Sequence, residues 1–497
     1  MSHPIIVGVA QLTQPKKVSE RLHPLKLIEN ASQIALEDVN SPKIVDHIDS
    51  IFMVNIRSWS YEDAPAELCE TLGIKPVHKV YLPDGGDTPQ MLTNRAANWI
   101  SLGKSNAVLI TGGEALYSIF NAEKGKISLD WPKKGKPSYM EGNIWDGTVP
   151  FENKYKIKFP PFSYALFETA VRAASNRSIK EHNQYMGKLM EKFSITASKN
   201  PHAWTQNSYS AEEITTPTPN NRYICHPYTK LMCSNVFVDQ SAAIIMTSDE
   251  IAEEIQIVRE KWVYLMGGAD FKNLHKITKR PRIYDSPAAR EGSRQALNQA
   301  GITLKDIYAF DIYSCFPSIV EIITKEIGLE ENDPRDLTIT GGLPYFGGPW
   351  SSYSMHSIVS AVELIRKNPS FNIMVVANGG YNTKQSFGIY GTKPPAQAWG
   401  ERDDSAVQEK IYADSLPNPI EKASGKLRID AYTIYYDREG VPKRGIAIGT
   451  LENRTHTFAF IEAKADILLE LEKQELVGQT FPVQYNIELE RNILEIK

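Results

Sequence analysis

The sequence predicts a mixed α/β protein of two similar halves, followed by a small β-barrel. Short apolar runs alternate with helical patterns along most of the chain, which is typical of α/β folds. The segment NAVLITGGEA near residue 110 is echoed by FNIMVVANGG near residue 375, and both read as an apolar strand that meets Gly-Gly. After about residue 425, alternating segments such as RIDAYTIYY predict half-buried strands.

The composition is that of a globular protein with more than one domain. The chain has 497 residues, of which 42% are hydrophobic and 23% charged, so a large core can form. The formal net charge is −4 and the sequence contains no basic run of five residues or more, so nothing indicates a nucleic-acid partner. The basic stretch 272–282 predicts a solvated face, with a phosphate site as the alternative.

Cysteine usage and the termini predict a reduced, cytoplasmic protein. The four cysteines form no CxxC pair and no Cys/His metal spacing, so we expect free thiols, no metal site and no tightly bound cofactor. The N-terminal segment lacks the charged and apolar parts of a signal peptide. No apolar run approaches 18 residues, so no membrane span is expected. The cysteines are Cys69, Cys225, Cys233 and Cys315.

The first half is predicted as four strands and a glycine-bordered helix. Strands are expected at 5–10, 51–56, 79–82 and 107–111, the last ending at a glycine pair. Gly85 and Gly86 permit an unusual backbone path in the turn after the third strand. Thr88 is predicted to cap the following helix, with Pro89 as its first residue and Asp87 complementing the helix dipole.

The second half repeats this order of strand, glycine turn and helix, which favours an internal duplication. Gly379 and Gly380 end its last strand, as the glycine pair ends the strand near residue 110. The expected elements are a strand at 307–313, a helix at 317–323, a glycine-rich loop at 341–349, a helix at 351–365 and a strand at 372–377.

The domain plan follows from these patterns. The insertion between the halves contains the stretch FPPFSYALFETA, a predicted helix through Ser175, and insertions of this kind often shape a pocket or lid. Strands at 426–436, 444–451, 457–462 and 481–489, with a helix at 466–474, predict a small OB-like barrel. The expected units are a core of 1–390 with halves 1–116 and 229–390 around the insertion 117–228, a linker or partly ordered wrap of 391–425, and a barrel of 426–497.

Five segments resemble the thiolase superfamily, in its sterol-carrier-protein-type and thiolase-like branch. They are NAVLITGGEAL, HPYTKLMCSNVFVDQSAAIIMTS, AFDIYSCFPSIVEI, GGLPYFGGPWSSY and VVANGGYN, and they follow the family order. The resemblance implies a thiolase fold, a five-layered αβαβα core of two similar halves. It also implies binding of acyl-coenzyme A and reactions that make or break carbon–carbon bonds beside the thioester carbonyl. The barrel resembles the extra domain of one thiolase-like subgroup.

The sequence departs from the thiolase pattern at the positions that carry chemistry. A thiolase needs a cysteine nucleophile at a helix N-terminus, an activating histidine, a second acid/base and oxyanion holes. The nucleophile position falls within residues 85–88, at Gly86, and the histidine of Gly-His-Pro becomes Gly348. The Cys-x-Gly turn becomes Ala377-Asn378-Gly379, and the turn after the strand at 307–313 reads Tyr313-Ser314-Cys315-Phe316.

Four residues are the catalytic candidates that remain. Tyr313 is either a donor to an enolate or aldol oxygen or an aromatic ring packed under the loop. Cys315 is either inert core or a reactive thiol. His356 lies eight residues past Gly348, roughly 12 Å along a straight helix, so a catalytic role and a structural one both stay open. Asn378 offers an amide to a carbonyl.

The glycine turns and one lysine are the candidates for substrate binding. Lys384 is either a partner of a coenzyme A phosphate or a surface lysine. The predicted substrate-binding residues are Gly85, Gly86, Gly348, Gly379, Gly380 and Lys384.

Two functions follow as hypotheses. The first is an acyltransferase of the acetyl-coenzyme A acetyltransferase kind, or a retro-aldol-type enzyme, that works without the usual nucleophilic cysteine on a coenzyme A thioester. The second is a non-catalytic protein that binds acyl-coenzyme A or lipid, or acts as a scaffold. The resemblance favours a homodimer paired through the core sheet, while a barrel that covers this surface favours a monomer.

Overall fold

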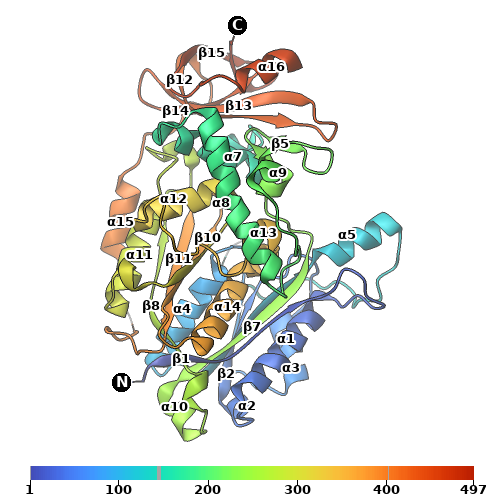
Figure 1. Ribbon diagram of the computed structural model, residues 1–497, viewed down its shortest axis with the longest axis vertical. Coiled ribbons are helices and arrows are strands. Elements are labelled where there is room, and N and C mark those ends of the chain that lie inside the picture. Colours follow the sequence, from blue (N-terminus) through green and yellow to red (C-terminus); the bar gives the residue numbers. More distant parts are fainter. Residues whose placement is uncertain (1, 143–146, 401, 497) are drawn as a thin grey trace.

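The core is a nine-stranded mixed sheet wrapped around two helices (Figure 1). The computed structural model describes residues 2–142, 147–400 and 402–496. The strand order is β3-β2-β4-β7-β1-β8-β11-β10-β9. The strands are β1 (Pro4–Thr13), β2 (Ile48–Val54), β3 (His78–Leu82), β4 (Ala107–Ala115), β7 (Asp239–Ser248), β8 (Val263–Lys272), β9 (Ala309–Ile312), β10 (Ile373–Gly379) and β11 (Lys384–Gly391).

The order of the strands confirms the predicted duplication. In each half the first strand in sequence lies at the middle of the sheet. It is followed outward by the last, the next-to-last and the second strand: β1-β7-β4-β2 and β8-β11-β10-β9. Because β7 spans residues 239–248, the second half begins after this strand and not at residue 229 as expected. The last strand of each half, β7 or β11, runs antiparallel to both neighbours, and the two outer ones pair in parallel. The halves join where Ile5 and Ile6 of β1 pair with Tyr264 and Val263 of β8.

Five layers result, as predicted. Helices α4 (Thr88–Ser101) and α14 (Tyr353–Lys367) form the central layer, and their apolar residues share one buried cluster with strands of both halves. Helices on the two outer faces complete the α/β core. The outer helices are α1 (Pro24–Val39) and α3 (Ala64–Leu72) on the first half, and α11 (Pro287–Ala300) and α12 (Pro317–Ile327) on the second.

Two local predictions in the first half were wrong. Helix α4 begins at Thr88, so Asp87 takes the cap position and Thr88 does not, and the Asp87 side chain makes no capping hydrogen bond. Strand β4 does not end at Gly112 but continues to Ala115. Both glycines of β4 remain paired with β7, since Gly113 lies opposite Ser241, and this ladder outweighs the weak strand preference of glycine.

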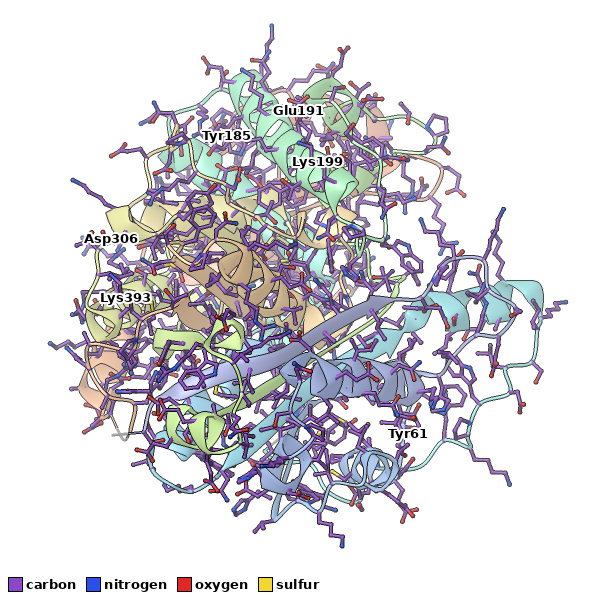
Figure 2. All side chains as sticks on the ribbon, turned by 60° about the horizontal axis from the view of Figure 1, so that its bottom comes forward. Tyr61, Tyr185, Glu191, Lys199, Asp306 and Lys393 are labelled. Atoms are coloured by element: carbon purple, nitrogen blue, oxygen red, sulfur yellow. The ribbon has the colours of Figure 1, made fainter. Side chains whose placement is uncertain are left out.

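The insertion supplies helices that lie between the core and the barrel. In Figure 1, α7 (Pro160–Ala174) and α8 (Ile179–Lys199) lie beneath the barrel, and Figure 2 shows Tyr185, Glu191 and Lys199 along α8. Helix α7 matches the helix predicted through Ser175. The other elements of the insertion are α5 (Leu116–Gly125), α6 (Pro150–Asn153), α9 (Ala211–Thr215), β5 (Tyr223–Cys225) and β6 (Tyr228–Thr229). Short helices elsewhere are α2 (Ile44–His47), α10 (Asp249–Glu254) and α13 (Gly342–Tyr345).

The C-terminal domain is a small closed barrel, as predicted. Its strands follow the order β13-β14-β16-β15-β12, and β12 pairs again with β13 to close the ring. The strand predicted at 481–489 is too long, because the chain turns after Asn486 and returns as a fifth strand. The elements are β12 (Ser424–Tyr436), β13 (Pro442–Leu451), β14 (His456–Ile461), α16 (Ala465–Leu471), β15 (Thr480–Asn486) and β16 (Arg491–Leu494).

The barrel is attached to the insertion as well as to the chain before it. Strand β5 extends the barrel sheet at one point, where Cys225 pairs with Tyr435 of β12. Thr169 on α7 donates its hydroxyl to the backbone oxygen of Tyr432 and accepts from the Tyr432 amide, at 2.9 and 3.1 Å. The barrel and α7 are therefore joined by hydrogen bonds to the backbone.

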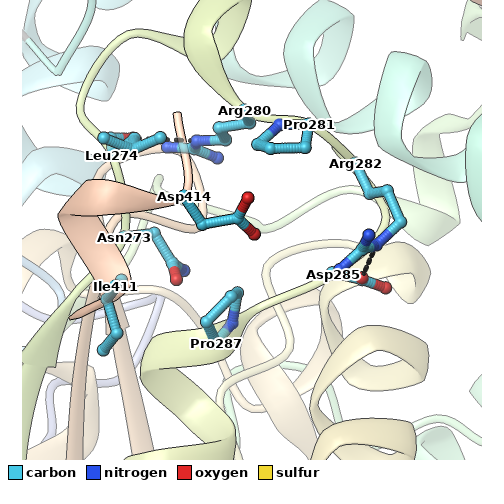
Figure 3. Close-up of a pocket in the computed structure, with 9 residues that line it drawn as sticks. All are labelled: Asn273, Leu274, Arg280, Pro281, Arg282, Asp285, Pro287, Ile411 and Asp414. Atoms are coloured by element: carbon cyan, nitrogen blue, oxygen red, sulfur yellow. Dashed lines mark hydrogen bonds and ion pairs between the residues drawn. The ribbon is translucent and has the colours of Figure 1, made fainter. Parts of the chain in front are cut away.

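The segment predicted as a linker or wrap is ordered over the core in the residues described. It carries helix α15 (Ser405–Ala413), and the indole of Trp399 donates to the backbone oxygen of Leu265 at 2.7 Å. A small cavity has a volume of about 30 Å³. Figure 3 draws the residues that line it, with Ile411 and Asp414 facing the segment 273–287. Within the described ranges, no helix has the length and apolar character that crossing a membrane requires.

Candidate active site between the two halves

Two of the predicted glycine turns and the turn after β9 meet at the N-terminal end of α4. A Cβ atom built on Gly86 would lie 2.5 Å from the hydroxyl oxygen of Tyr313 and 2.5 Å from the backbone oxygen of Asn378. One built on Gly379 would collide with the carboxylate of Asp87. The turn before α4, the turn after β9 and the end of β10 therefore touch one another, and only glycine fits at residues 86 and 379.

The segment that opens α14 fixes the turn before α4 from a second side. Ser351 accepts a hydrogen bond from the Gly85 amide at 2.9 Å, and Ser354 donates its hydroxyl to the Gly86 oxygen at 2.9 Å. Gly348, in the loop before this segment, donates its amide to the backbone oxygen of Asn235 at 2.8 Å. The glycine-rich loop before α14 is thus held against the site and against the segment that leads into β7.

Tyr313 is held as a neutral hydrogen-bond donor. Its side chain is only 8% exposed and its ring stands edge-on to Tyr353, with centroids 5.6 Å apart. Burial raises the pKa of the Tyr313 phenol well above its usual value, and the neighbouring Cys315 and Asp87 raise it further. The phenol therefore keeps its proton at physiological pH.

Asn378 is part of a buried polar chain that reaches into the insertion. Its amide nitrogen donates to the hydroxyl oxygen of Tyr164 at 2.9 Å, and its oxygen accepts from the side chain of Gln385 at 2.8 Å. Tyr164 in turn donates to the backbone oxygen of Gly380 at 2.8 Å. These bonds fix the Asn378 side chain, while its backbone oxygen faces Gly86.

Tyr164 and Gln385 were missed from the sequence. Tyr164 belongs to the FPPFSYALFETA stretch of α7, and its ring stacks on Phe316 with centroids 4.7 Å apart. The proline-aromatic composition of that stretch was the available signal that this helix packs against the site.

Three of the four thiols are buried, that of Cys233 is half-buried, and all four are protonated. Burial raises the pKa of Cys315 to about 12, although the Tyr164 hydroxyl lowers it in part. Burial raises the pKa of Cys69 to about 11 and those of Cys225 and Cys233 further. A thiolate nucleophile requires the opposite shift.

His356 lies on the β1 side of α14. Its Nδ1 atom is 3.1 Å from the side-chain oxygen of Gln11, and its ring packs on Phe346. Burial lowers the pKa of His356 to about 3, so the ring is neutral. In the described part of the chain, no hydrogen bond or ring contact joins His356 to Tyr313 or Asn378.

Asp87 and Lys384 form an ion pair across the two halves, with 2.9 Å between carboxylate and ammonium. Asp87 comes from the turn before α4 and Lys384 from the start of β11. The Lys384 side chain is 21% exposed, and a Cβ on Gly85 would lie 2.5 Å from its nitrogen. Lys384 was expected at a coenzyme A phosphate or on the surface, and the structure places its charge beside the glycine turns, paired with Asp87.

Comparison with known proteins identifies the family. Residues 406–486 match the sequence family described as the thiolase-like protein type 1 additional C-terminal domain. The crystal structure of a monomeric SCP2-thiolase-like protein type 1 from Mycobacterium smegmatis shares 32% identity, with 100% of this chain and 99% of that chain covered and a TM-score of 0.85. The chain belongs to the SCP2-thiolase-like proteins of type 1.

More distant likenesses of this type 1 protein agree on the fold. An Ltp2-ChsH2(DUF35) aldolase is 18% identical, over 78% of this chain and 97% of that chain, with a TM-score of 0.58. Human mitochondrial 3-ketoacyl-CoA thiolase in complex with CoA is 15% identical, over 79% and 98%, with a TM-score of 0.56. An acetyl-CoA acetyltransferase of Methanocaldococcus jannaschii is 20% identical over 284 residues, which span 56% of this chain and 65% of that protein.

Proposed function

We propose that this type 1 protein acts on an acyl-coenzyme A thioester at the site beside Gly86. It would form or break a carbon–carbon bond by aldol-type chemistry, without a covalent acyl-cysteine. The observation that carries the proposal is the contact between Gly86 and Tyr313. A phenol hydroxyl fills the space into which the side chain at residue 86 would extend.

The state of the thiols supports a route without a nucleophile. Acyl transfer through cysteine needs a thiolate that a helix N-terminus or a neighbouring cation stabilises. Burial instead raises the pKa of Cys315 to about 12, and residues 85–88 contain no cysteine. A retro-aldol step needs only a base, an acceptor for developing negative charge and a positioned substrate.

The reaction can be written with the groups that meet at the site. A base takes the proton of the β-hydroxyl group, the Cα–Cβ bond breaks, and its electron pair forms the enolate of the shortened acyl thioester. The other product is an aldehyde or ketone, and the enolate then takes a proton at Cα. We assign Tyr313 as the donor to the enolate oxygen and Asp87, held by Lys384, as the proton acceptor.

The substrate class rests on the relatives. A thiolase of this fold is known in complex with CoA, and an aldolase shares the same fold. In the proposal the thioester arrives as substrate, in line with the expectation of no tightly bound cofactor. The M. smegmatis relative is monomeric, and we propose a monomer for this chain as well.

The second candidate is a non-catalytic protein that binds acyl-coenzyme A or lipid, or acts as a scaffold. The observation in its favour is how enclosed the polar groups are, because Asn378 is 1% exposed and its side-chain hydrogen bonds are already made within the protein. The neutral, buried His356 also fits a structural role.

One experiment separates the two candidates. Binding of several acyl-coenzyme A compounds is measured by calorimetry, and turnover of β-hydroxyacyl- and β-ketoacyl-coenzyme A is followed with wild type, Tyr313→Phe and the surface control Tyr412→Phe. Loss of turnover in Tyr313→Phe alone supports the aldol-type enzyme. Binding without turnover supports the second candidate, and no binding at all would contradict both the enzyme and an acyl-coenzyme A-binding role, which leaves lipid binding or scaffolding.

A further inference from the structure

A second polar cluster lies apart from the glycine turns, where three helices converge under the barrel. It consists of Glu168 on α7, His182 on α8 and Glu321 on α12, all buried. Glu168 follows Tyr164 by one helical turn, roughly 6 Å along the axis of α7. The cluster is thus one helical turn away from the candidate active site, and no step of the proposed chemistry uses its residues.

The three side chains point at one another. The Nε2 atom of His182 lies 2.6 Å from a carboxylate oxygen of Glu168 and 3.7 Å from one of Glu321. One potential ligand atom from each residue lies within 4.8 Å of the other two. Two carboxylate oxygens and one imidazole nitrogen at such distances match the donor set of a zinc-type cation.

One oxygen of the cluster lacks a partner. The Oε1 atom of Glu321 is buried with no hydrogen-bond partner among the described residues, and the Glu321 side chain is 4% exposed. This oxygen is the one that faces His182. A buried carboxylate oxygen without a partner costs free energy unless a proton or a cation satisfies it.

The other carboxylate is oriented in the way a metal ligand usually is. The second oxygen of Glu168 accepts a hydrogen bond from the Tyr228 hydroxyl at 2.6 Å, and the Tyr228 oxygen lies 2.8 Å from the hydroxyl of Ser318. Outer contacts of this kind hold ligand side chains in place and tune the metal.

A cavity of about 550 Å³ borders the cluster. Glu168 and His182 line it, together with Arg172, His226 and Glu475 at the junction with the barrel. The side chains of Glu168 and His182 are 0% and 1% exposed, so water from the cavity would complete the coordination only once a cation held by the three ligands opens a position for it.

We propose that Glu168, His182 and Glu321 bind a divalent transition-metal cation of the zinc type. The imidazole ligand excludes the hard cations Mg²⁺ and Ca²⁺ as the preferred occupants, since these select oxygen donors. Spacing in the sequence does not reveal the set, because the three residues come from separate helices and form no Cys/His pair.

Arg177 competes with the cation for this site. One of its nitrogens lies 3.2 Å from the second oxygen of Glu321 and 3.3 Å from Nδ1 of His182. Bound metal at Nε2 leaves the imidazole proton on Nδ1, where it faces the guanidinium, a group that can only donate. Arg177 also pairs with Glu331 at 2.6 Å and lies over the ring of Tyr185, so it has other partners when it withdraws.

The test uses the full-length protein. Chelator-treated protein is titrated with Zn²⁺ in a calorimeter, bound zinc is counted by elemental analysis after dialysis, and Co²⁺ is added as a spectroscopic probe of nitrogen and oxygen ligands. Wild type is expected to bind one equivalent of Zn²⁺. Glu321→Gln, which keeps the side-chain shape, and His182→Ala are each expected to weaken binding by at least about 10-fold.

Two further variants make the result decisive. His47→Ala removes a histidine remote from the cluster and is expected to bind as wild type does. Arg177→Gln removes the competing charge and is expected to tighten binding by roughly 10-fold. Folding of each variant is checked by circular dichroism. The proposal is overturned if folded wild type retains no zinc, or if His182→Ala retains as much as wild type, which would indicate an adventitious ion only.

Discussion

The hydroxyl of Tyr313 lies where a side chain at residue 86 would begin, so the tyrosine and the missing side chain exclude one another. Asn378 closes the same space with its backbone oxygen. The two halves of the core thus meet through a phenol at the end of β9 and a glycine at the start of α4. This contact makes the first prediction specific.

Gly86→Ala is expected to destabilise the protein by about 1–3 kcal/mol, because its new Cβ atom overlaps Tyr313 and a backbone oxygen that cannot move freely. The cost of Gly86→Ala should be smaller in the Tyr313→Ala background than in wild type, because the phenol that the new Cβ atom overlaps is then absent. A double-mutant cycle from urea unfolding measures this coupling. Additive losses would mean that the two residues do not touch.

The ion pair between Asp87 and Lys384 is expected to contribute to stability because it is largely buried. Lys384→Met leaves the Asp87 carboxylate without its cation and should cost about 1–3 kcal/mol, and Asp87→Asn should cost less in the Lys384→Met background than alone. The pair between Lys473 and Glu470, whose side chains are 68% and 64% exposed, is the matched control. Lys473→Met should change stability by less than about 0.5 kcal/mol.

Glu472 is expected to make stability depend on pH. Burial raises its pKa from 4.5 to about 7, and its facing groups are the hydroxyl of Tyr436 and the ring of His226. Between about pH 4.5 and 7, Glu472 therefore keeps its proton in the folded protein but releases it in the unfolded chain. The contribution of this carboxyl is fully present below pH 4.5 and is lost as the pH rises through 7.

Glu472→Gln removes that dependence. Between pH 4.5 and pH 8, the stability of the variant should rise relative to wild type by about 3 kcal/mol. Urea unfolding of both proteins at the two pH values measures the difference. Parallel pH profiles for the two proteins would contradict the raised pKa.

Thr169 is expected to anchor the barrel to α7. Thr169→Val removes both hydrogen bonds to the Tyr432 backbone. The buried amide and oxygen of Tyr432 lose these partners, at a cost of about 1–3 kcal/mol. Hydrogen exchange in β12 should become faster while exchange in β7 stays unchanged. Thr196→Val, at a half-buried position of α8, is the control and should leave both strands as in wild type.

The sequence predicted the fold because local patterns carry it. Six of the nine core strands were expected as apolar runs, and the glycine pairs mark similar points in both halves, but β7, β8 and β11 were not predicted as strands. The turn at Gly86 could also be predicted, because the sequence itself shows the adjacent glycines Gly85 and Gly86. The continuation of β4 through its glycine pair could not, since the partner strand β7 lies more than a hundred residues away in the chain.

The side-chain partners at the site could not be predicted, because tertiary contacts alone bring them together. Asp87 was expected to complement the helix dipole, yet its carboxylate turns toward Lys384 from the other half. Tyr164 comes from the insertion, and nothing in its local sequence shows that it meets Asn378. The same holds for Glu168 and Glu321, which neighbour each other only once α7 and α12 pack together.

The pairing of Cys225 with Tyr435 also means that two strand neighbours leave the ribosome at different times during translation. The two residues are about 210 positions apart, and translation at about 5–20 residues per second separates their emergence by roughly 10–40 s. During that interval the hairpin of β5 and β6 leaves the ribosome without its neighbour strand. A nascent chain arrested before residue 424 would therefore expose a strand edge that chaperones recognise, and completion of the barrel would bury it.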